Sequence, residues 1–156
     1  MELPARVLVL LQERGETLAT AESLTGGRLA AALTGVPGAS RSYLGGVVAY
    51  ATSVKQDLLG VPAALVERYG VISAECALAM ARGAAGATGA VWGVGTTGVA
   101  GPDRQEGHPP GTVHVGLVGP GVSTALALEL VGGRGAIQDR TCQEALSALE
   151  HLLVRQ

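Results

Sequence analysis

The sequence contains no phenylalanine, one tryptophan and three tyrosines, which excludes a core built on stacked aromatic rings. Alanine, valine and leucine must fill the interior instead, and 24 glycines allow the backbone to turn or to pack closely. Of 156 residues, 47% are hydrophobic and 15% charged, which is enough for a core without disulfides or metals. We therefore expect a single domain over residues 1–156, with helices lying close to a sheet.

The sequence lacks the features that several functional classes require. The net charge of −2 and the scattered arginines provide no basic face for direct nucleic-acid binding. Cys76 and Cys142 lie in apolar helical patterns without CxxC spacing, which predicts buried thiols, and the three histidines are not spaced as metal ligands. We expect no metal and no other cofactor. Without a signal-peptide pattern or an 18-residue apolar run, the chain is predicted to be cytoplasmic and not to bind membranes.

Lysine is almost absent too, because Lys55 stands alone beside ten arginines. An arginine is effectively always protonated, whereas burial can remove the charge of a lysine and make it a base or a nucleophile. The lack of asparagine and the abundance of Ala, Gly, Val and Arg also fit a genomic codon bias. Lys55 is therefore either a catalytic amine or an ordinary solvated helix residue.

Hydrophobic periodicity divides the chain into alternating helices and strands. Helices are predicted at residues 3–14, 28–33, 62–68, 73–86 and 136–153, with a further short helix capped by Thr52–Ser53 that carries Lys55 in its first turn. Strands are predicted at residues 17–22, 43–50, 90–96, 112–118 and 123–130, of which the last two form a hairpin and the second is apolar enough to be buried. This order predicts a three-layer α/β/α sandwich with a mixed, mostly parallel sheet.

Three segments with glycine or polar residues follow predicted strands, at residues 23–27, 50–55 and 97–102. Ligands of open α/β sheets bind at the carboxyl ends of strands, so these segments are expected to form one pocket. Neither glycine pattern matches a nucleotide-binding fingerprint. The pocket would contain a hydroxyl, a phenol and an amine, which is a combination suited to acyl transfer at an amide or ester.

In this hypothesis Ser23 attacks a carbonyl group, and Lys55, alone or with Tyr50, takes up the proton and returns it to the leaving group. The amides of Gly26 and Gly27 are candidates to stabilise the oxyanion. The N-terminus of the helix that follows is a candidate anion site.

The same residues also have structural interpretations. Ser23 or Thr25 can cap a helix, and Tyr50 can cover the edge of the sheet. The loop at 97–102 can be a tight turn without a ligand, and Glu22 fits either a supporting acid or a solvated carboxylate. The residues alone leave both interpretations open.

Longer motifs run in the same order along nearly the whole chain as in one known family. They cover residues 17–27, 50–60, 70–73, 97–102 and 111–115. Through them the sequence resembles the C-terminal domain of the competence/damage-inducible protein CinA, also found alone as the nicotinamide-nucleotide amidase PncC. The resemblance implies an α/β/α fold with a mixed sheet, and hydrolysis of the carboxamide of nicotinamide mononucleotide to nicotinic acid mononucleotide and ammonia in pyridine nucleotide salvage. We expect a stand-alone domain, without the other CinA domain that resembles molybdopterin-binding proteins.

The resemblance also assigns roles to residues of this chain. It implies Ser23 as the nucleophile, with Tyr50 and Lys55 as its partners in proton transfer. Substrate-binding roles fall on Thr25, Gly26, Gly27, Thr97, Gly98 and Gly101, and on Arg134, which could bind the phosphate with two hydrogen bonds. An apolar, alanine-rich surface on the last helix makes a homodimer the expected oligomeric state.

Five positions depart from the family pattern: Leu24, Ala51, Thr52, Gly133 and Gln138. Leu24 stands where cysteine is usual, and Gln138 where a second arginine is frequent. A hydrogen bond to a charged group contributes about 1.5–3 kcal/mol, so loss of that arginine predicts weaker phosphate binding or an altered substrate preference. These departures motivate a second hypothesis, a catalytically silent module that binds a nucleotide or a partner and is linked to competence or DNA damage.

Overall fold

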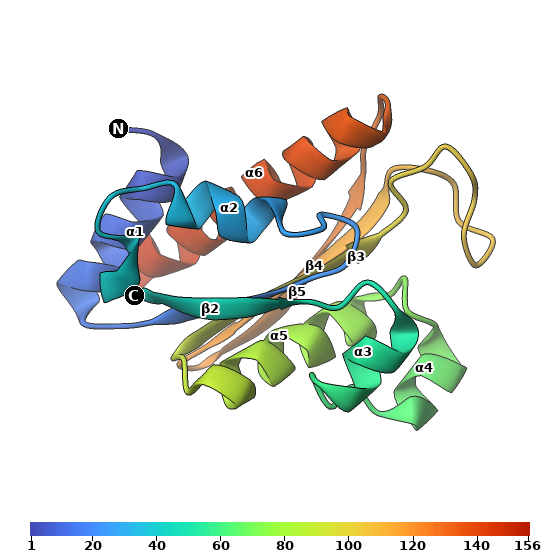
Figure 1. Cartoon of the computed structure of the whole chain (residues 1–156), viewed down its shortest axis with the longest axis horizontal. Helices are drawn as coiled ribbons and strands as arrows, with labels where there is room; N and C mark the ends of the chain where they lie inside the picture. The colour runs from blue at the N-terminus through green and yellow to red at the C-terminus, as the bar shows by residue number, and fades with distance from the viewer.

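The computed structural model describes residues 1–156 and arranges five strands and six α-helices around one sheet (Figure 1). In chain order the elements are α1 (Leu3–Arg14), β1 (Leu18–Glu22), α2 (Arg28–Thr34), the 3-10 helix η1 (Ala39–Arg41), β2 (Tyr43–Val48), α3 (Thr52–Asp57), α4 (Ala63–Tyr69), α5 (Ala74–Thr88), β3 (Trp92–Gly98), β4 (Thr112–Gly119), β5 (Val122–Glu129) and α6 (Arg134–Arg155). All of the predicted helices and strands are present. The main difference in length is at α6, which begins before the predicted Ala136 and includes Arg134.

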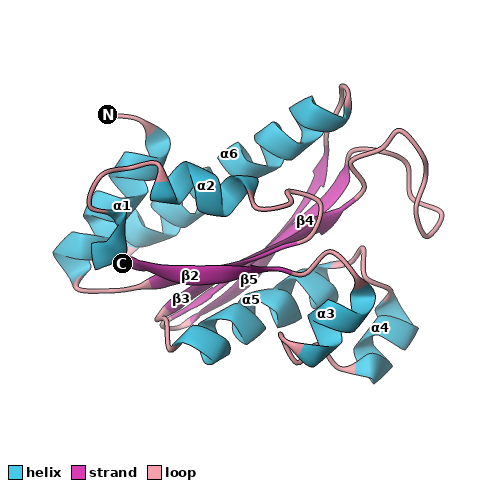
Figure 2. Ribbon diagram, in the orientation of Figure 1, coloured by secondary structure: helices cyan, strands magenta, loops and turns pink.

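The strands form one sheet in the order β2-β1-β3-β4-β5. Strand β1 pairs in parallel with β2 and β3, whereas β4 pairs antiparallel with β3 and β5. Four strands therefore run in one direction and only β4 runs in the other. Helices α1, α2 and α6 cover one face of the sheet, and α3, α4 and α5 cover the other (Figure 2). The predicted three-layer sandwich with a mixed, mostly parallel sheet is confirmed.

Two hydrophobic cores, one on each face, hold the layers together. The larger core packs α1, α2 and α6 against Trp92 and other buried residues of the sheet, and the smaller joins α5 to β1. Helix α5 lies so close to the sheet that a Cβ atom at Gly95 or Gly116 would collide with the carbonyl oxygen of Ala77. The glycines of β3 and β4 therefore permit the close packing that the lack of large side chains predicts.

Two of the predicted caps are confirmed. Gly15 ends α1 in the left-handed conformation, with φ of 65°, and the Ser73 hydroxyl caps α5 by accepting a hydrogen bond from the Cys76 amide. Cys76 and Cys142 are buried free thiols, as predicted. No helix has the combination of length and apolar character that a membrane crossing requires.

Two predictions around Tyr50 are wrong. Strand β2 is not buried, because it forms an edge of the sheet and pairs on one side only, which leaves Leu44 47% and Val48 50% exposed. The hydroxyls of Thr52 and Ser53 do not cap α3, since Ala51 takes the capping position and both residues lie inside the first turn.

Candidate active site

Parallel pairing brings the ends of three strands together. Glu22, the last residue of β1, lies opposite Val48 of β2 and Thr96 of β3. Ser23 follows β1 directly, and its amide donates to the Thr96 carbonyl at 3.0 Å. The segments that follow these strands therefore meet at the carboxyl edge of the sheet, where an open α/β sheet binds its ligands.

Lys55 reaches this edge from α3, on the opposite side of Ser23 from α2. Its side chain is buried, with 2% relative exposure, and Nζ lies 3.0 Å from Ser23 Oγ. The amine also donates to the carbonyl oxygens of Ala49, at 2.8 Å, and Tyr50, at 3.1 Å. Both carbonyls can only accept, so they take two N–H groups. A neutral amine bonded in this way has its one lone pair left for the Ser23 hydroxyl proton.

The surroundings of Lys55 favour that neutral form. Burial lowers the pKa of Lys55, and the negative charge of the Glu106 carboxylate, like that of Cys76 when it ionises, raises it by a smaller amount. Burial also raises the pKa of Cys76 to about 11, so the thiol behind Lys55 is uncharged at neutral pH. No salt bridge to Lys55 is formed, and the ammonium is therefore not stabilised by an ion pair.

The N-terminus of α2 is already occupied by an internal carboxylate. Glu22 is 1% exposed and accepts hydrogen bonds from the amides of Leu29, at 2.8 Å, and Ala30, at 3.0 Å. The expectation of a free anion site at this helix end is therefore wrong, because Glu22 fills it. Its role is to hold the turn that follows Ser23, and it is not a solvated carboxylate.

The turn after Ser23 excludes one of the two predicted oxyanion donors, Gly26, whereas the Gly27 amide donates to no acceptor within the chain. The Gly26 amide donates to the Ser23 carbonyl at 3.1 Å, and is therefore not free to bind a ligand. Like that of Gly27, the amides of Leu24 and Thr25 donate to no acceptor within the chain. In hydrolases the amide next to the nucleophile is a frequent oxyanion donor, so if Ser23 is the nucleophile, the position of Leu24 in the sequence makes its amide a candidate.

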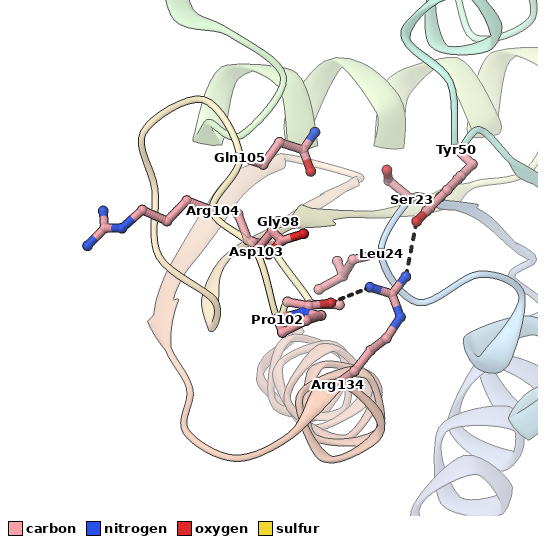
Figure 3. Close-up of a pocket in the computed structure, with 12 residues that line it drawn as sticks. Ser23, Leu24, Tyr50, Gly98, Pro102, Asp103, Arg104, Gln105 and Arg134 are labelled. Atoms are coloured by element: carbon pink, nitrogen blue, oxygen red, sulfur yellow. Dashed lines mark hydrogen bonds between the residues drawn. The ribbon is translucent and has the colours of Figure 1, made fainter.

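Ser23 opens onto a pocket of about 380 Å³, a volume that suits a small molecule (Figure 3). Of the residues predicted to form the site, five line this pocket: Ser23, Tyr50, Gly98, Gly101 and Arg134. Lys55 lies behind Ser23. Four predicted substrate-binding residues lie outside the lining: Thr25, Gly26, Gly27 and Thr97.

Two threonines near the pocket direct their hydroxyls into the protein. The Thr25 hydroxyl is buried and hydrogen-bonded to that of Thr96 at 2.8 Å, and Thr97 donates to the Val71 carbonyl at 2.6 Å. In this arrangement both hydroxyls fix the strand ends and do not face a ligand.

Arg134 lies across the pocket at the start of α6. Its guanidinium donates to the Gly101 carbonyl and, at 3.0 Å, to the Tyr50 hydroxyl (Figure 3). Tyr50 is 62% exposed, and its hydroxyl has no hydrogen bond to Ser23 or Lys55. The structure thus brings Ser23 and Lys55 into contact, and it pairs Tyr50 with Arg134.

Sequence reasoning missed the outer wall of the pocket and one contact behind it. Asp103, Arg104 and Gln105, from the loop between β3 and β4, line the pocket opposite Tyr50 (Figure 3). The polar composition of this loop was the only signal. Gln138 donates to the Leu24 carbonyl at 2.8 Å, so it holds the peptide that follows Ser23. No cluster of His, Cys, Asp or Glu is arranged to hold a metal ion.

Comparisons with known proteins agree on one family. The family described as "CinA C-terminal domain" matches residues 1–153. A CinA-like protein of Frankia casuarinae is 47% identical over 147 residues, which are 94% of this chain and 34% of that protein. A putative competence-damage inducible protein of Limosilactobacillus reuteri is 47% identical over 153 residues, 96% of this chain and 37% of that protein. The chain thus spans little more than a third of the length of these curated relatives.

Solved structures of the same group have the same fold. A competence-damaged protein (CinA) superfamily protein from Klebsiella pneumoniae superposes with a TM-score of 0.95 at 32% identity, covering 99% of this chain and 97% of that one. The competence/damage inducible protein CihA from Agrobacterium tumefaciens gives a TM-score of 0.92 at 33% identity, with 96% and 93% covered.

Proposed function

This chain belongs to the family of the CinA C-terminal domain, and from that membership and the Ser23–Lys55 contact we propose that it is a nicotinamide-nucleotide amidase. The proposed reaction is hydrolysis of the carboxamide of nicotinamide mononucleotide to nicotinic acid mononucleotide and ammonia, a step of pyridine nucleotide salvage. The observation that carries the proposal is a buried amine 3.0 Å from a hydroxyl at the base of a pocket. An uncharged lysine beside a serine is a combination that activates the hydroxyl for acyl transfer.

The first half of the reaction forms an acyl-enzyme. Lys55 Nζ accepts the proton of the Ser23 hydroxyl as Oγ attacks the carboxamide carbon, which gives a tetrahedral intermediate with a negative oxygen. The amides of Leu24 and Thr25 are the proposed donors to that oxygen, since neither donates within the chain. Collapse of the intermediate breaks the C–N bond, and the proton on Lys55 passes to the leaving nitrogen, which departs as ammonia.

The second half returns the enzyme to its starting state. A water molecule gives a proton to Lys55 as its oxygen attacks the ester carbon. The C–Oγ bond then breaks, and Ser23 recovers its proton from Lys55. One water is consumed, and the products are one carboxylic acid and one ammonia. The Ala49 and Tyr50 carbonyls hold Nζ in the same position throughout, because they bind it through both proton transfers.

Release of ammonia from nicotinamide mononucleotide tests the proposal directly. We expect turnover by the unmodified protein, measured with an enzymatic ammonia assay and confirmed by chromatography of nicotinic acid mononucleotide. Calorimetric binding of the mononucleotide without turnover would favour the silent binding module instead and contradict the amidase.

Arg134 is the proposed phosphate ligand within this site. Arg134→Ala is expected to raise KM for nicotinamide mononucleotide by about 10- to 100-fold with a smaller change in kcat, because one charged hydrogen-bonding partner contributes about 1.5–3 kcal/mol. The measurement is steady-state kinetics on the mononucleotide and on its riboside, which has no phosphate. The variant should affect the riboside much less.

Arg140→Ala is the matched control for this experiment. Arg140 lies on the same helix and pairs with Glu144 at 2.8 Å, away from the pocket. The Arg140→Ala variant loses one positive charge, as Arg134→Ala does, but it keeps every residue that lines the pocket. Its KM should therefore stay close to that of the unmodified protein. Equal losses for mononucleotide and riboside in Arg134→Ala would rule out a phosphate contact.

A further inference from the structure

Glu106 has an unusual position in the loop between β3 and β4. Its φ of 50° makes it the only non-glycine residue in the left-handed region, where most side chains are disfavoured. The turn around it is closed by two backbone hydrogen bonds between Gln105 and His108, of 3.1 and 2.9 Å. Such a backbone conformation persists only where surrounding contacts hold it.

Those contacts come from the connection between α4 and α5. Although Glu106 is exposed as a whole, its carboxylate accepts hydrogen bonds from the amides of Val71, at 3.0 Å, and Ile72, at 3.1 Å. Gly70 lies so near that a Cβ atom there would be 2.8 Å from the same carboxylate. The carboxylate therefore fits a site made of backbone, in which a side chain at residue 70 would intrude.

The contact joins the outer wall of the pocket to its base. Asp103, Arg104 and Gln105, which line the pocket, directly precede Glu106. On the other side, Val71 accepts the hydrogen bond from Thr97 near the end of β3. The loop is thus fastened through Glu106 to the same strand end on which Ser23 is positioned.

We propose that Glu106 is a positioning residue of the amidase site: its carboxylate fastens the β3–β4 loop to the amides of Val71 and Ile72 and so holds the outer wall of the pocket against the substrate. The inference rests on the proposed function only for its catalytic consequence, because the fastening itself can be measured without turnover. The negative charge of Glu106 also acts on the Lys55 amine. The other titratable group that acts on this amine is Cys76, which is uncharged at neutral pH and contributes only when it ionises.

Two variants separate the role of the Glu106 carboxylate as a hydrogen-bond acceptor from the role of its negative charge. Glu106→Ala removes the acceptors, and we expect kcat/KM to fall by about 100-fold, the size of effect that a displacement of about 1 Å in a site produces. Glu106→Gln keeps one acceptor oxygen and removes the charge, and we expect a loss of about 10-fold. Glu67→Gln on α4 is the control, since Glu67 is exposed and makes no ion pair.

The pH profile distinguishes this role from a purely structural one. A negative charge near Lys55 stabilises its ammonium and raises its pKa, so removal of that charge lowers the pKa. The acidic limb of the pH–rate profile reports deprotonation of this amine, and in Glu106→Gln its midpoint should move to lower pH. Glu67→Gln should leave the midpoint in place.

Hydrogen exchange measures the fastening without any reaction. In Glu106→Ala the amides of Val71 and Ile72 should exchange at least about 10-fold faster than in the unmodified protein, because their acceptor is gone. Unchanged exchange at both amides would overturn the inference, as would full kcat/KM in Glu106→Ala of an active enzyme. Absence of ammonia release by the unmodified protein would refute the proposed function alone. The exchange rates of the two amides would still show whether Glu106 holds the β3–β4 loop in place.

Discussion

Replacement of Ser23 by alanine is expected to lower the rate of ammonia release from nicotinamide mononucleotide by at least about 10,000-fold, because the nucleophile acts as a unit with its base. Ser23 is 8% exposed at the base of the pocket, and its hydroxyl is the only side-chain group within hydrogen-bond distance of Lys55 Nζ. Without Oγ no acyl-enzyme can form. The measurement is kcat by the ammonia assay, with mass spectrometry of the unmodified protein to detect the acyl-enzyme after rapid quenching.

Ser53→Ala provides the matched control for this loss. Ser53 is an exposed serine on α3, two residues before Lys55, and it caps no helix. Its replacement should leave kcat within about twofold, in line with the small effects of surface substitutions. The thermal stability of Ser23→Ala should stay close to that of the unmodified protein. Turnover by a folded Ser23→Ala protein at the unmodified rate would refute the proposed mechanism.

Lys55→Arg should abolish turnover to a similar extent, although it retains a positive side chain of similar length. A guanidinium stays protonated at any pH at which the protein folds, so it can donate to Ser23 Oγ but cannot accept its proton. Burial of the larger charged group also strains the site, and Lys55→Ala is therefore needed as a second variant. Both should lose at least about 1,000-fold in kcat, within the range of contributions made by a general base and its placement.

Chemical rescue makes the Lys55 experiment independent of folding. In Lys55→Ala a small primary amine can enter the space left by the side chain and bind the Ala49 and Tyr50 carbonyls. Ethylamine should restore part of the activity, more at high pH where it is neutral, whereas it should not rescue Ser23→Ala. Retention of full activity by Lys55→Arg would show that no neutral amine is required.

The central pair of the site was predictable because its signals are local. Strand periodicity placed Ser23 directly after a short strand, and the isolation of Lys55 among arginines indicated a residue whose charge can be removed by burial. The parallel pairing of β1 with β2 and β3 then brings these segments together without any further information. The three-layer fold was predictable for the same reason, because the alternation of helices and strands is also visible in local sequence patterns.

The parts that sequence reasoning missed depend on contacts between distant residues. Glu106 bonds to amides 34 and 35 residues away, and Gln138 reaches a carbonyl 114 residues away, so no local pattern reports them. Glu22 lies beside Ser23 in the sequence, yet its role as a cap of α2 follows from the direction of its side chain. Likewise, the position of β2 at the sheet edge is a property of the strand order.

The ionisation of Lys55 is the quantity on which the account depends, and the sequence makes it directly measurable. Because Lys55 is the only lysine, protein grown with isotope-labelled lysine gives one set of side-chain NMR signals, whose chemical shifts can be followed as the pH is raised. We expect the Lys55 amine to titrate below its ordinary pKa of 10.5, since burial disfavours the ammonium. A midpoint at or above 10.5 would contradict this mechanism, because burial would then not favour the neutral amine that must accept the serine proton.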